Sequence, residues 1–207
     1  MMWQYIESKP ATTRSTNRII ASYGTANKSD LYDVLSSSKY SHAVKYGENF
    51  LYQEYETLPI HPAWYKIEFI LQLFNTYDLV FFIDADAGIC NIDYNIFDLV
   101  GKEDVTIAKT AEGINTGVFA IRKSENTMLA LHNALACYNT DQTRLYEESA
   151  LVNALNEAHC TMCFVDDTIF NASICTQTND TAILHLMLDF AKTLAPAHIH
   201  YLLNKHH

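Results

Sequence analysis

The stretch LVFFIDADAGI, residues 79–89, runs five apolar residues directly into Asp84 and Asp86. A short run rich in Val, Ile and Phe is typical of a strand buried on both faces, whereas carboxylates resist burial. In open α/β sheets, ligands bind beyond the carboxyl ends of the strands. The stretch therefore predicts a core strand at residues 79–83 whose tip carries two acids into a crevice.

The two acids can share one site because side chains two residues apart on an extended segment point the same way. Two neighbouring carboxylates repel each other, and a divalent cation relieves that repulsion. Mn²⁺ and Mg²⁺ prefer oxygen ligands and often bind substrate phosphates as well. We therefore expect Asp84 and Asp86 to bind Mn²⁺ or Mg²⁺. The structural alternative is a pair of acids in an ordinary turn or helix cap after the strand.

The composition indicates a packed globular chain that is poorly suited to nucleic acid. The chain has 207 residues, of which 49% are hydrophobic, so we expect one domain over residues 1–207 with one sizeable core. Residues 1–16 are polar and are expected to form a loose N-terminal arm. The formal net charge is −10 and no basic run is present, which argues against nucleic-acid binding. A phosphate ligand would therefore need a metal ion or backbone N–H groups.

Cysteine usage and hydropathy predict a soluble, cytoplasmic chain without a membrane span. The five cysteines are odd in number and scattered, which does not suggest a disulfide framework. The N-terminal stretch lacks the apolar core of a signal peptide. No apolar run approaches the roughly 18 residues that a spanning helix needs.

Strand and helix signals alternate along the chain, which indicates an α/β sandwich with a mainly parallel central sheet flanked by helices, as in Rossmann-like folds. A first strand is expected to stop at Gly24, Pro62 is expected to open a helix, and Ser124 is a plausible N-cap. The expected strands are 18–23, 49–53, 79–83, 105–108 and 117–121, and the expected helices are 29–46, one from Pro62 through Phe74, 128–137 and 147–158.

The stretch HPAWYKIEFILQLFNTYDLVFFIDADAGI, residues 61–89, resembles the core of nucleotide-sugar glycosyltransferases of the GT-A fold. It is similar in particular to the family of yeast galactosyl/mannosyltransferases and plant xyloglucan xylosyltransferases, which combines a Trp-x-Lys helix with an apolar strand ending in Asp-x-Asp. Later landmarks follow in the family's order: Ile114-Asn-Thr-Gly-Val118, Glu147-Glu-Ser-Ala-Leu151, residues 164–171 and residues 180–185. The compact chain also resembles the glycosyltransferase domain with which large chlorella-type viruses decorate their capsid protein.

The resemblance implies an enzyme that uses Mn²⁺ or Mg²⁺ to move a sugar from a UDP-sugar donor to a glycan or glycoprotein acceptor, with retention. By resemblance, His185 completes the metal site of Asp84 and Asp86, although a histidine between two leucines also fits a core strand. The donor-binding residues that it implies are Ser22, Tyr23, Gly24, Thr25, Lys66, Asp84, Ala85, Asp86, Asn115, Thr116 and Gly117.

Each group in this donor site has an expected role. Tyr23, at the end of the first strand, could stack on the base, and Gly24 lets the backbone approach the nucleoside. Lys66 is expected on the uridine or phosphate side, with a solvated lysine as the alternative. Asn115 offers both donor and acceptor groups to sugar hydroxyls.

The catalytic candidates are Glu147, Glu148 and Asn115, which the resemblance places near the reacting sugar carbon. There a side chain would position the sugar and stabilise positive charge without being a covalent nucleophile. Glu148 and Ser149 stand where the family pattern predicts Gln and Asp, which leaves the donor sugar open. Acids in the first turn of a helix are also stabilising on their own.

Three other interpretations stay open. A haloacid-dehalogenase-type phosphatase also has an apolar strand ending in Asp-x-Asp, with the first Asp as nucleophile, but that motif normally lies near the start of the domain. A non-catalytic nucleotide-sugar-binding protein would keep the fold without transferring a sugar. The sequence His159-Cys160-x-x-Cys163 suggests a zinc site but lacks an evident fourth ligand.

Overall fold

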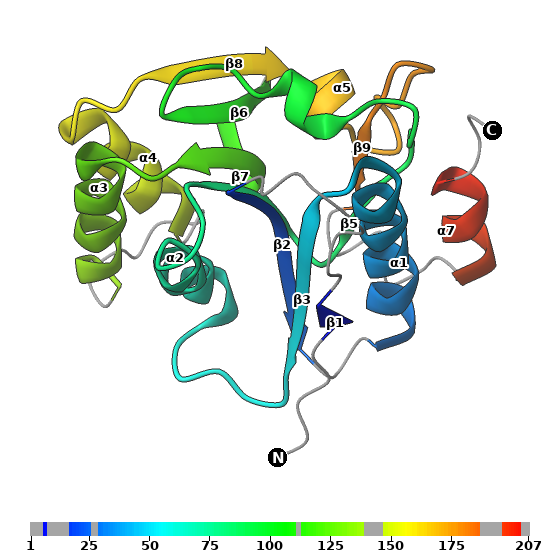
Figure 1. The fold of residues 1–207 in the computed structure, drawn as a ribbon, viewed down its shortest axis with the longest axis horizontal. Coiled ribbons are helices and arrows are strands. Elements are labelled where there is room, and N and C mark those ends of the chain that lie inside the picture. Colours follow the sequence, from blue (N-terminus) through cyan, green and yellow to red (C-terminus); the bar gives the residue numbers. More distant parts are fainter. Residues whose placement is uncertain are drawn as a thin grey trace.

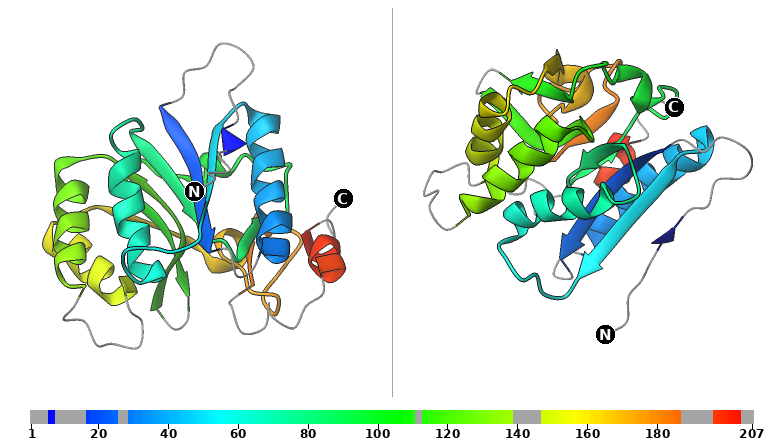
Figure 2. Two further views of the ribbon diagram at one scale, coloured as in Figure 1. Left: turned by 90° about the horizontal axis from the view of Figure 1, so that it is seen from below. Right: turned by 60° about the vertical axis from the view of Figure 1, so that its left-hand side comes forward.

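The computed structural model describes residues 6–7, 17–25, 29–110, 113–138, 147–186 and 196–203. Within them, helices lie on both faces of a central sheet, as Figures 1 and 2 show. Most of the expected N-terminal arm, residues 1–16, lies outside the described residues. None of the described helices is long and apolar enough to cross a membrane.

The described residues form a central sheet of seven strands in the order β1-β3-β2-β4-β7-β6-β8. The β2/β3, β2/β4 and β6/β8 pairs are parallel, and the other neighbouring pairs are antiparallel. Following these pairings, only β1 and β7 run against the common direction, which confirms the mainly parallel sheet. The strands are β1 (Ile6–Glu7), β2 (Arg18–Thr25), β3 (Asn49–Tyr55), β4 (Leu79–Ile83), β6 (Val105–Thr110), β7 (Gly113–Arg122) and β8 (Met162–Asp166).

A second, two-stranded sheet carries the segment after the acid pair. Strand β5 (Ala87–Ile89) pairs antiparallel with β9 (Ile183–His185), and the register sets Ala87 opposite His185. The backbone N–H of Leu186 also donates to the carbonyl oxygen of Asp86 at 2.9 Å. The pairing of β5 with β9 therefore brings two parts of the chain that are distant in sequence together beside the acids.

The helices form two layers, one on each face of the central sheet (Figures 1 and 2). Helices α2 (Pro62–Leu73), α3 (Glu125–Ala136) and α4 (Glu147–Glu157) supply residues to the hydrophobic cluster on one face. Helix α1 (Ser29–Tyr46) covers the other face, and α7 (Pro196–Leu203) packs against α1. The short helices are the 3-10 helix η2 (Ile96–Leu99) and α5 (Asp167–Phe170).

Strand β4 is buried on both faces, as its composition predicts. Val80 and Phe82 belong to the cluster that packs under α2, α3 and α4. Phe81 and Ile83 belong to the cluster on the α1 side. This alternation with a period of two residues makes β4 the centre of both layers, and it fixes the direction in which the acid pair leaves the sheet.

Local signals placed the starts of α1 and α2 correctly, whereas the helix expected at 128–137 begins at Glu125. Pro62 occupies the first turn of α2, and Ser124 caps α3 through a reciprocal capping box.

The strands expected at 49–53, 105–108 and 117–121 are longer in the structure, because ladders with neighbouring strands extend β3, β6 and β7. The expected stop at Gly24 is wrong, because the parallel ladder with β3 continues to Thr25. A Cβ atom at Gly24 would lie 2.4 Å from the hydroxyl oxygen of Tyr52, so glycine serves a close approach here and not a turn.

His42 on α1 gives the fold a dependence on pH. The side chain is completely buried, and its Nε2 lies 3.0 Å from the carbonyl oxygen of Tyr94. Burial lowers the pKa of His42 from 6.5 to about 4. Between these values the unfolded chain binds a proton that the folded chain does not, so folding stability falls as the pH drops from about 6.5 towards 4.

We predict that His42→Gln reduces this acid sensitivity. The difference between the unfolding free energies at pH 7 and pH 4.5, measured by urea denaturation, should shrink by about 2 kcal/mol. His132→Gln on the exposed side of α3 is the matched control and should leave the difference unchanged. An equal difference in wild type and His42→Gln would contradict the prediction.

Candidate active site

A cavity of about 510 Å³ opens at the carboxyl ends of β2 and β4, and its volume suits a small organic ligand. Of the predicted site residues, it is lined by Tyr23, Gly24, Thr25, Lys66, Asp84, Ala85, Asp86, Asn115, Glu147 and His185. Ser22, Thr116, Gly117 and Glu148 are not among the lining residues and instead support them. Tyr32, His61, Pro62 and Ala63 also line the cavity, although the sequence predicted a site role for none of them and indicated only that Pro62 opens a helix.

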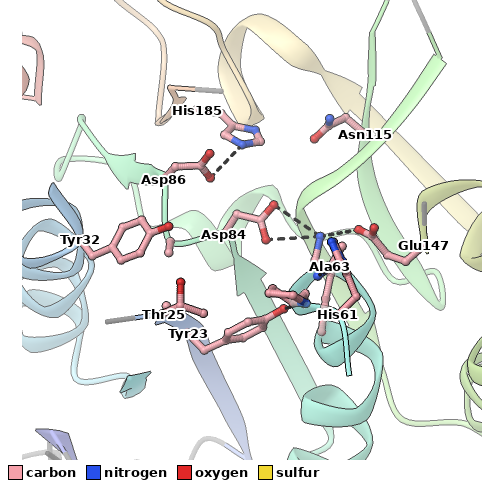
Figure 3. A pocket seen from close by; sticks show the side chains of 14 residues that line it. Tyr23, Thr25, Tyr32, His61, Ala63, Asp84, Asp86, Asn115, Glu147 and His185 are labelled. Carbon is pink, nitrogen blue, oxygen red and sulfur yellow. Dashed lines mark hydrogen bonds and ion pairs between the residues drawn. The ribbon is translucent and has the colours of Figure 1, made fainter. Parts of the chain in front are cut away.

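Asp84, Asp86 and His185 form a group that could hold a metal ion, with one ligand atom from each residue lying within 4.8 Å of the others (Figure 3). Nε2 of His185 lies 3.2 Å from Oδ1 of Asp86. Adjacent ligands of an octahedral Mg²⁺ at about 2.1 Å lie about 3 Å apart, so this spacing fits a hard divalent cation. The two carboxylates also match the ligand preferences of Mn²⁺ and Mg²⁺.

The zinc alternative finds no support in the geometry. Within the described ranges, no group of three His, Cys, Asp or Glu side chains other than Asp84, Asp86 and His185 gathers its ligand atoms in this way. His159, Cys160 and Cys163 all lie in those ranges and form no such group.

Lys66 is the central cation of the site. Only 3% of the residue is exposed, which rules out the solvated lysine considered for the sequence. Its Nζ lies 2.9 Å from Oε1 of Glu147, 3.3 Å from Oδ1 of Asp84 and 2.9 Å from the carbonyl oxygen of Thr116. Burial acts to lower the pKa of Lys66, but Asp84 and Glu147 outweigh it and raise the pKa. The ammonium group therefore stays charged between two carboxylates.

The two acids of the Asp-x-Asp motif differ in their surroundings. Burial raises the pKa of Asp84 to about 6, with Lys66 opposing that rise. Burial also acts to raise the pKa of Asp86, but His185 outweighs it and lowers the pKa. Since Asp84 shares its carboxylate with Lys66, Asp86 and His185 are the better placed pair for a cation.

Lys39 on α1 contacts the Asp-x-Asp segment from the other face of the sheet, a position that no local sequence pattern predicted. Its side chain is completely buried, and its Nζ donates to the Ser22 hydroxyl at 2.9 Å and to the Asp84 carbonyl oxygen at 2.8 Å. Burial lowers the pKa of Lys39 to about 7, and Asp86 and Asp84 act against that shift. Ser22, expected to contact the donor, therefore tethers Lys39.

Tyr23 lies deeper than the predicted stacking role suggests. Its ring has edge-on contacts with Tyr55, Tyr65 and Phe69, and its hydroxyl donates to the carbonyl oxygen of Pro62. The residue is only 7% exposed, so it offers the cavity little of its ring. Stacking of a base on Tyr23 stays a prediction.

Tyr32 on α1 lines the cavity beside the acids, on the side that lies away from Asn115 and Glu147 (Figure 3). Burial raises the pKa of its hydroxyl to about 12, with smaller contributions from Asp86 and Asp84. The neutral hydroxyl can donate a hydrogen bond to an anionic ligand near the motif. A tyrosine in the first half of a polar helix gave no local signal of such a role.

The three catalytic candidates divide into two groups. Asn115 and Glu147 line the cavity, whereas the carboxylate of Glu148 accepts the backbone N–H of Thr116 at 2.9 Å. Burial raises the pKa of Glu148, and that hydrogen bond opposes the rise. Both glutamates also lie in the first turn of α4, where acids stabilise the helix. Glu147 is therefore the glutamate that faces the cavity, whereas Glu148 is bound to the backbone of β7.

No protein-family model matches the sequence, and no curated protein matches it significantly. Solved structures do match the fold. A glycosyltransferase involved in glycosylation of the major capsid of PBCV-1 aligns with a TM-score of 0.70 at 16% identity, covering 90% of this chain and 98% of that one. The glycosyltransferase GlyE of Streptococcus pneumoniae TIGR4 gives 0.64 at 14% identity, over 84% of this chain and 55% of GlyE.

A third match is a Drosophila β1,4-galactosyltransferase 7 mutant in complex with manganese, UDP-Gal and xylobiose. It aligns with a TM-score of 0.52 at 11% identity, covering 85% of this chain and 73% of that one. At these identities the matches show the architecture. The protein has the GT-A glycosyltransferase fold, as the order of its sequence landmarks predicts.

Gly117 is required by the crowding around Asp84 and His185. A Cβ atom there would lie 2.3 Å from Cε1 of His185 and 2.9 Å from Oδ2 of Asp84. We predict that Gly117→Ala displaces both candidate ligands and weakens Mn²⁺ binding by about 10-fold or more, measured by electron paramagnetic resonance of free Mn²⁺. Gly47→Ala is the control for a destabilising change away from the site: its φ of +67° strains an alanine, but a Cβ atom there meets nothing within 4 Å, so Mn²⁺ affinity should stay unchanged. Equal Mn²⁺ affinity in wild type and Gly117→Ala would show that the crowding does not matter.

Removing Lys66 should show the cost of leaving its two partners, the buried Glu147 and the partly buried Asp84, without a counter-ion. We predict that Lys66→Met lowers the free energy of unfolding at pH 7 by about 3 kcal/mol, because Asp84 and Glu147 lose their counter-ion. The loss should shrink at pH 5, where protonation neutralises the stranded Asp84 carboxylate, whose pKa burial already raises. Lys45→Met removes an exposed pair with Asp93 and should cost less than about 1 kcal/mol. Equal losses in the two variants would refute a central role for Lys66.

Proposed function

We propose that the protein is a metal-dependent glycosyltransferase that moves a sugar from a UDP-sugar donor to a glycan or glycoprotein acceptor, with retention. One observation carries the proposal. The group Asp84, Asp86 and His185 lies on the wall of a cavity of about 510 Å³, at the carboxyl ends of two parallel strands of a GT-A fold. That position is where open α/β sheets bind their ligands.

Asp86 and His185, with Asp84, would hold Mn²⁺ or Mg²⁺. Such an ion supplies Lewis-acid stabilisation of the charge that develops on a diphosphate leaving group. The chain has a net charge of −10 and would otherwise repel a nucleoside diphosphate. The manganese and UDP-Gal bound by the Drosophila protein support this choice of ligands.

The remaining lining residues divide by position. Tyr32 and Thr25 stand on the wall of the cavity away from Asn115 and Glu147, so we assign the nucleoside to that side (Figure 3). Asn115 and Glu147 stand on the other side of Asp84, so we assign the transferred sugar to them. This arrangement sets the diphosphate between the two ends, beside the acids.

Glu147 is the group that we propose for stabilising positive charge at the reacting carbon. Its Oε1 accepts from Lys66 at 2.9 Å and from the Thr116 hydroxyl at 3.2 Å, which holds the carboxylate in place. Because the carboxylate is already fixed in a buried site, the protein does not have to reorganise when positive charge develops at the reacting carbon. Retention itself is proposed from the sequence resemblance. The PBCV-1 protein acts in capsid glycosylation, which supports a glycoprotein acceptor.

The donor site can be tested by thermal denaturation. We predict that UDP with Mn²⁺ raises the melting temperature by several degrees and that EDTA abolishes the shift, because the diphosphate needs the cation. Asp86→Asn should abolish the shift as well, whereas Asp98→Asn, an exposed acid in η2, should keep it. A panel of UDP-hexoses, UDP-xylose and UDP-rhamnose, scored for metal-dependent hydrolysis, would then identify the sugar.

Two results would count against the proposal. If no nucleoside diphosphate raises the melting temperature, the proposed donor site is wrong. Hydrolysis of p-nitrophenyl phosphate that is lost in Asp84→Asn would instead favour the phosphatase interpretation.

A further inference from the structure

Asn171 links the metal-binding group to the sugar side of the cavity. The residue follows α5 directly and is 3% exposed. Its Oδ1 lies 2.9 Å from Nδ1 of His185, and its Nδ2 donates to Oδ1 of Asn115 at 2.9 Å. One carboxamide therefore contacts a candidate metal ligand on β9 and a candidate sugar ligand on β7.

The backbone holds Asn171 rigidly in this position. Its N–H donates to the carbonyl oxygen of Asp167 at 3.0 Å. The next residue, Ala172, donates to Ile183 at 3.1 Å and accepts from the N–H of His185 at 2.8 Å. Asn171 is thus attached to the same strand that carries His185, so the two side chains keep their relative positions.

The direction of each hydrogen bond follows from one backbone group. The N–H of Gly117 can only donate, and it donates to Oδ1 of Asn115 at 2.9 Å. Since that oxygen only accepts, the group of Asn171 that faces it must be the Nδ2 amide. Oδ1 of Asn171 then faces Nδ1 of His185, which must carry a proton to donate.

Two consequences follow for the site. A proton held on Nδ1 of His185 makes Nε2, which lies 3.2 Å from Oδ1 of Asp86, the nitrogen that would bind a cation in place of a proton. With its Oδ1 occupied by two donors, Asn115 presents its Nδ2 hydrogens to a ligand in the cavity that it lines.

We propose that Asn171 is a positioning residue that sets the His185 tautomer for the cation and the Asn115 amide orientation for the donor sugar. The inference rests on the proposed function, since it assigns a cation and a sugar to the two ends of the relay. Asn171 itself is not among the residues that line the cavity, so it acts through the other two side chains.

The metal half is tested with Mn²⁺ alone, without nucleotide. Asn171→Ala removes the acceptor for Nδ1–H of His185, so Mn²⁺ should bind about 10- to 100-fold more weakly, measured by electron paramagnetic resonance. Asn171→Asp keeps an acceptor at that position, so its affinity should stay within about threefold of wild type. Asn153→Ala, at an exposed asparagine on α4, is the matched control and should bind Mn²⁺ like wild type.

The sugar half is tested with Asn171→Asp, which sets a carboxylate oxygen against Oδ1 of Asn115 in place of an amide donor. The probes are UDP and the UDP-sugar that wild type hydrolyses fastest in the panel, both with Mn²⁺. The variant should bind UDP as tightly as wild type does. Its kcat should fall about 10-fold, and so should the ratio of its affinity for the UDP-sugar to its affinity for UDP. Added to Asn115→Ala, Asn171→Asp should cause no further loss, because both changes act on one contact.

The outcomes separate this proposal from the proposed function. Wild-type Mn²⁺ affinity in a folded Asn171→Ala would overturn the role at His185, and a loss of affinity in Asn171→Asp equal to that in Asn171→Ala would do the same. Additive effects with Asn115→Ala would overturn the role at Asn115. If wild type binds Mn²⁺ but no nucleotide, the proposed function and the Asn115 half fail, while the ratio of Mn²⁺ affinities still decides the His185 half.

Discussion

The site depends on the burial of one ammonium group between two carboxylates. Lys66 comes from α2, Asp84 from the end of β4 and Glu147 from the start of α4, so three elements converge on one cation. A buried carboxylate without a counter-ion is strongly destabilising, which makes their relative positions interdependent. The charge balance that allows the acids to be buried also aims them at the cavity. Stability and ligand binding are thus served by the same contacts.

The second constraint is a chain of hydrogen bonds with fixed polarity. It runs from the N–H of Gly117 through Asn115 and Asn171 to His185. Its first donor is a backbone group whose role is fixed, so every later side chain has only one allowed orientation. Lys66 balances the charge of the carboxylates on one side of Asp84. On the other side, the hydrogen-bond chain sets the orientations of Asn115 and His185. Between them lies the cavity whose lining includes the candidate metal ligands Asp84, Asp86 and His185.

The sequence predicted those features that local patterns encode. The apolar run of β4, the proline that opens α2 and the cap of α3 were recognisable because each acts on its nearest neighbours in the chain. The stop expected at Gly24 was wrong, since a ladder with a distant strand extended β2 past the glycine. Lys39 was missed for the same reason. Its polar helical surroundings predict a solvated side chain, and only packing of α1 on the sheet buries it beneath the acids.

By itself, the sequence determined that a buried strand of an α/β sheet carries two acids at its carboxyl end. The order of its landmarks also indicated the GT-A fold. Only the tertiary structure decided which residues those acids meet. Asp86 faces His185 because β5 pairs with β9, and Asp84 faces Lys66 because α2 packs on β4. Local patterns specify which face of an element is buried and where the element ends. They do not specify which distant element covers it, because that choice depends on the packing of the whole core.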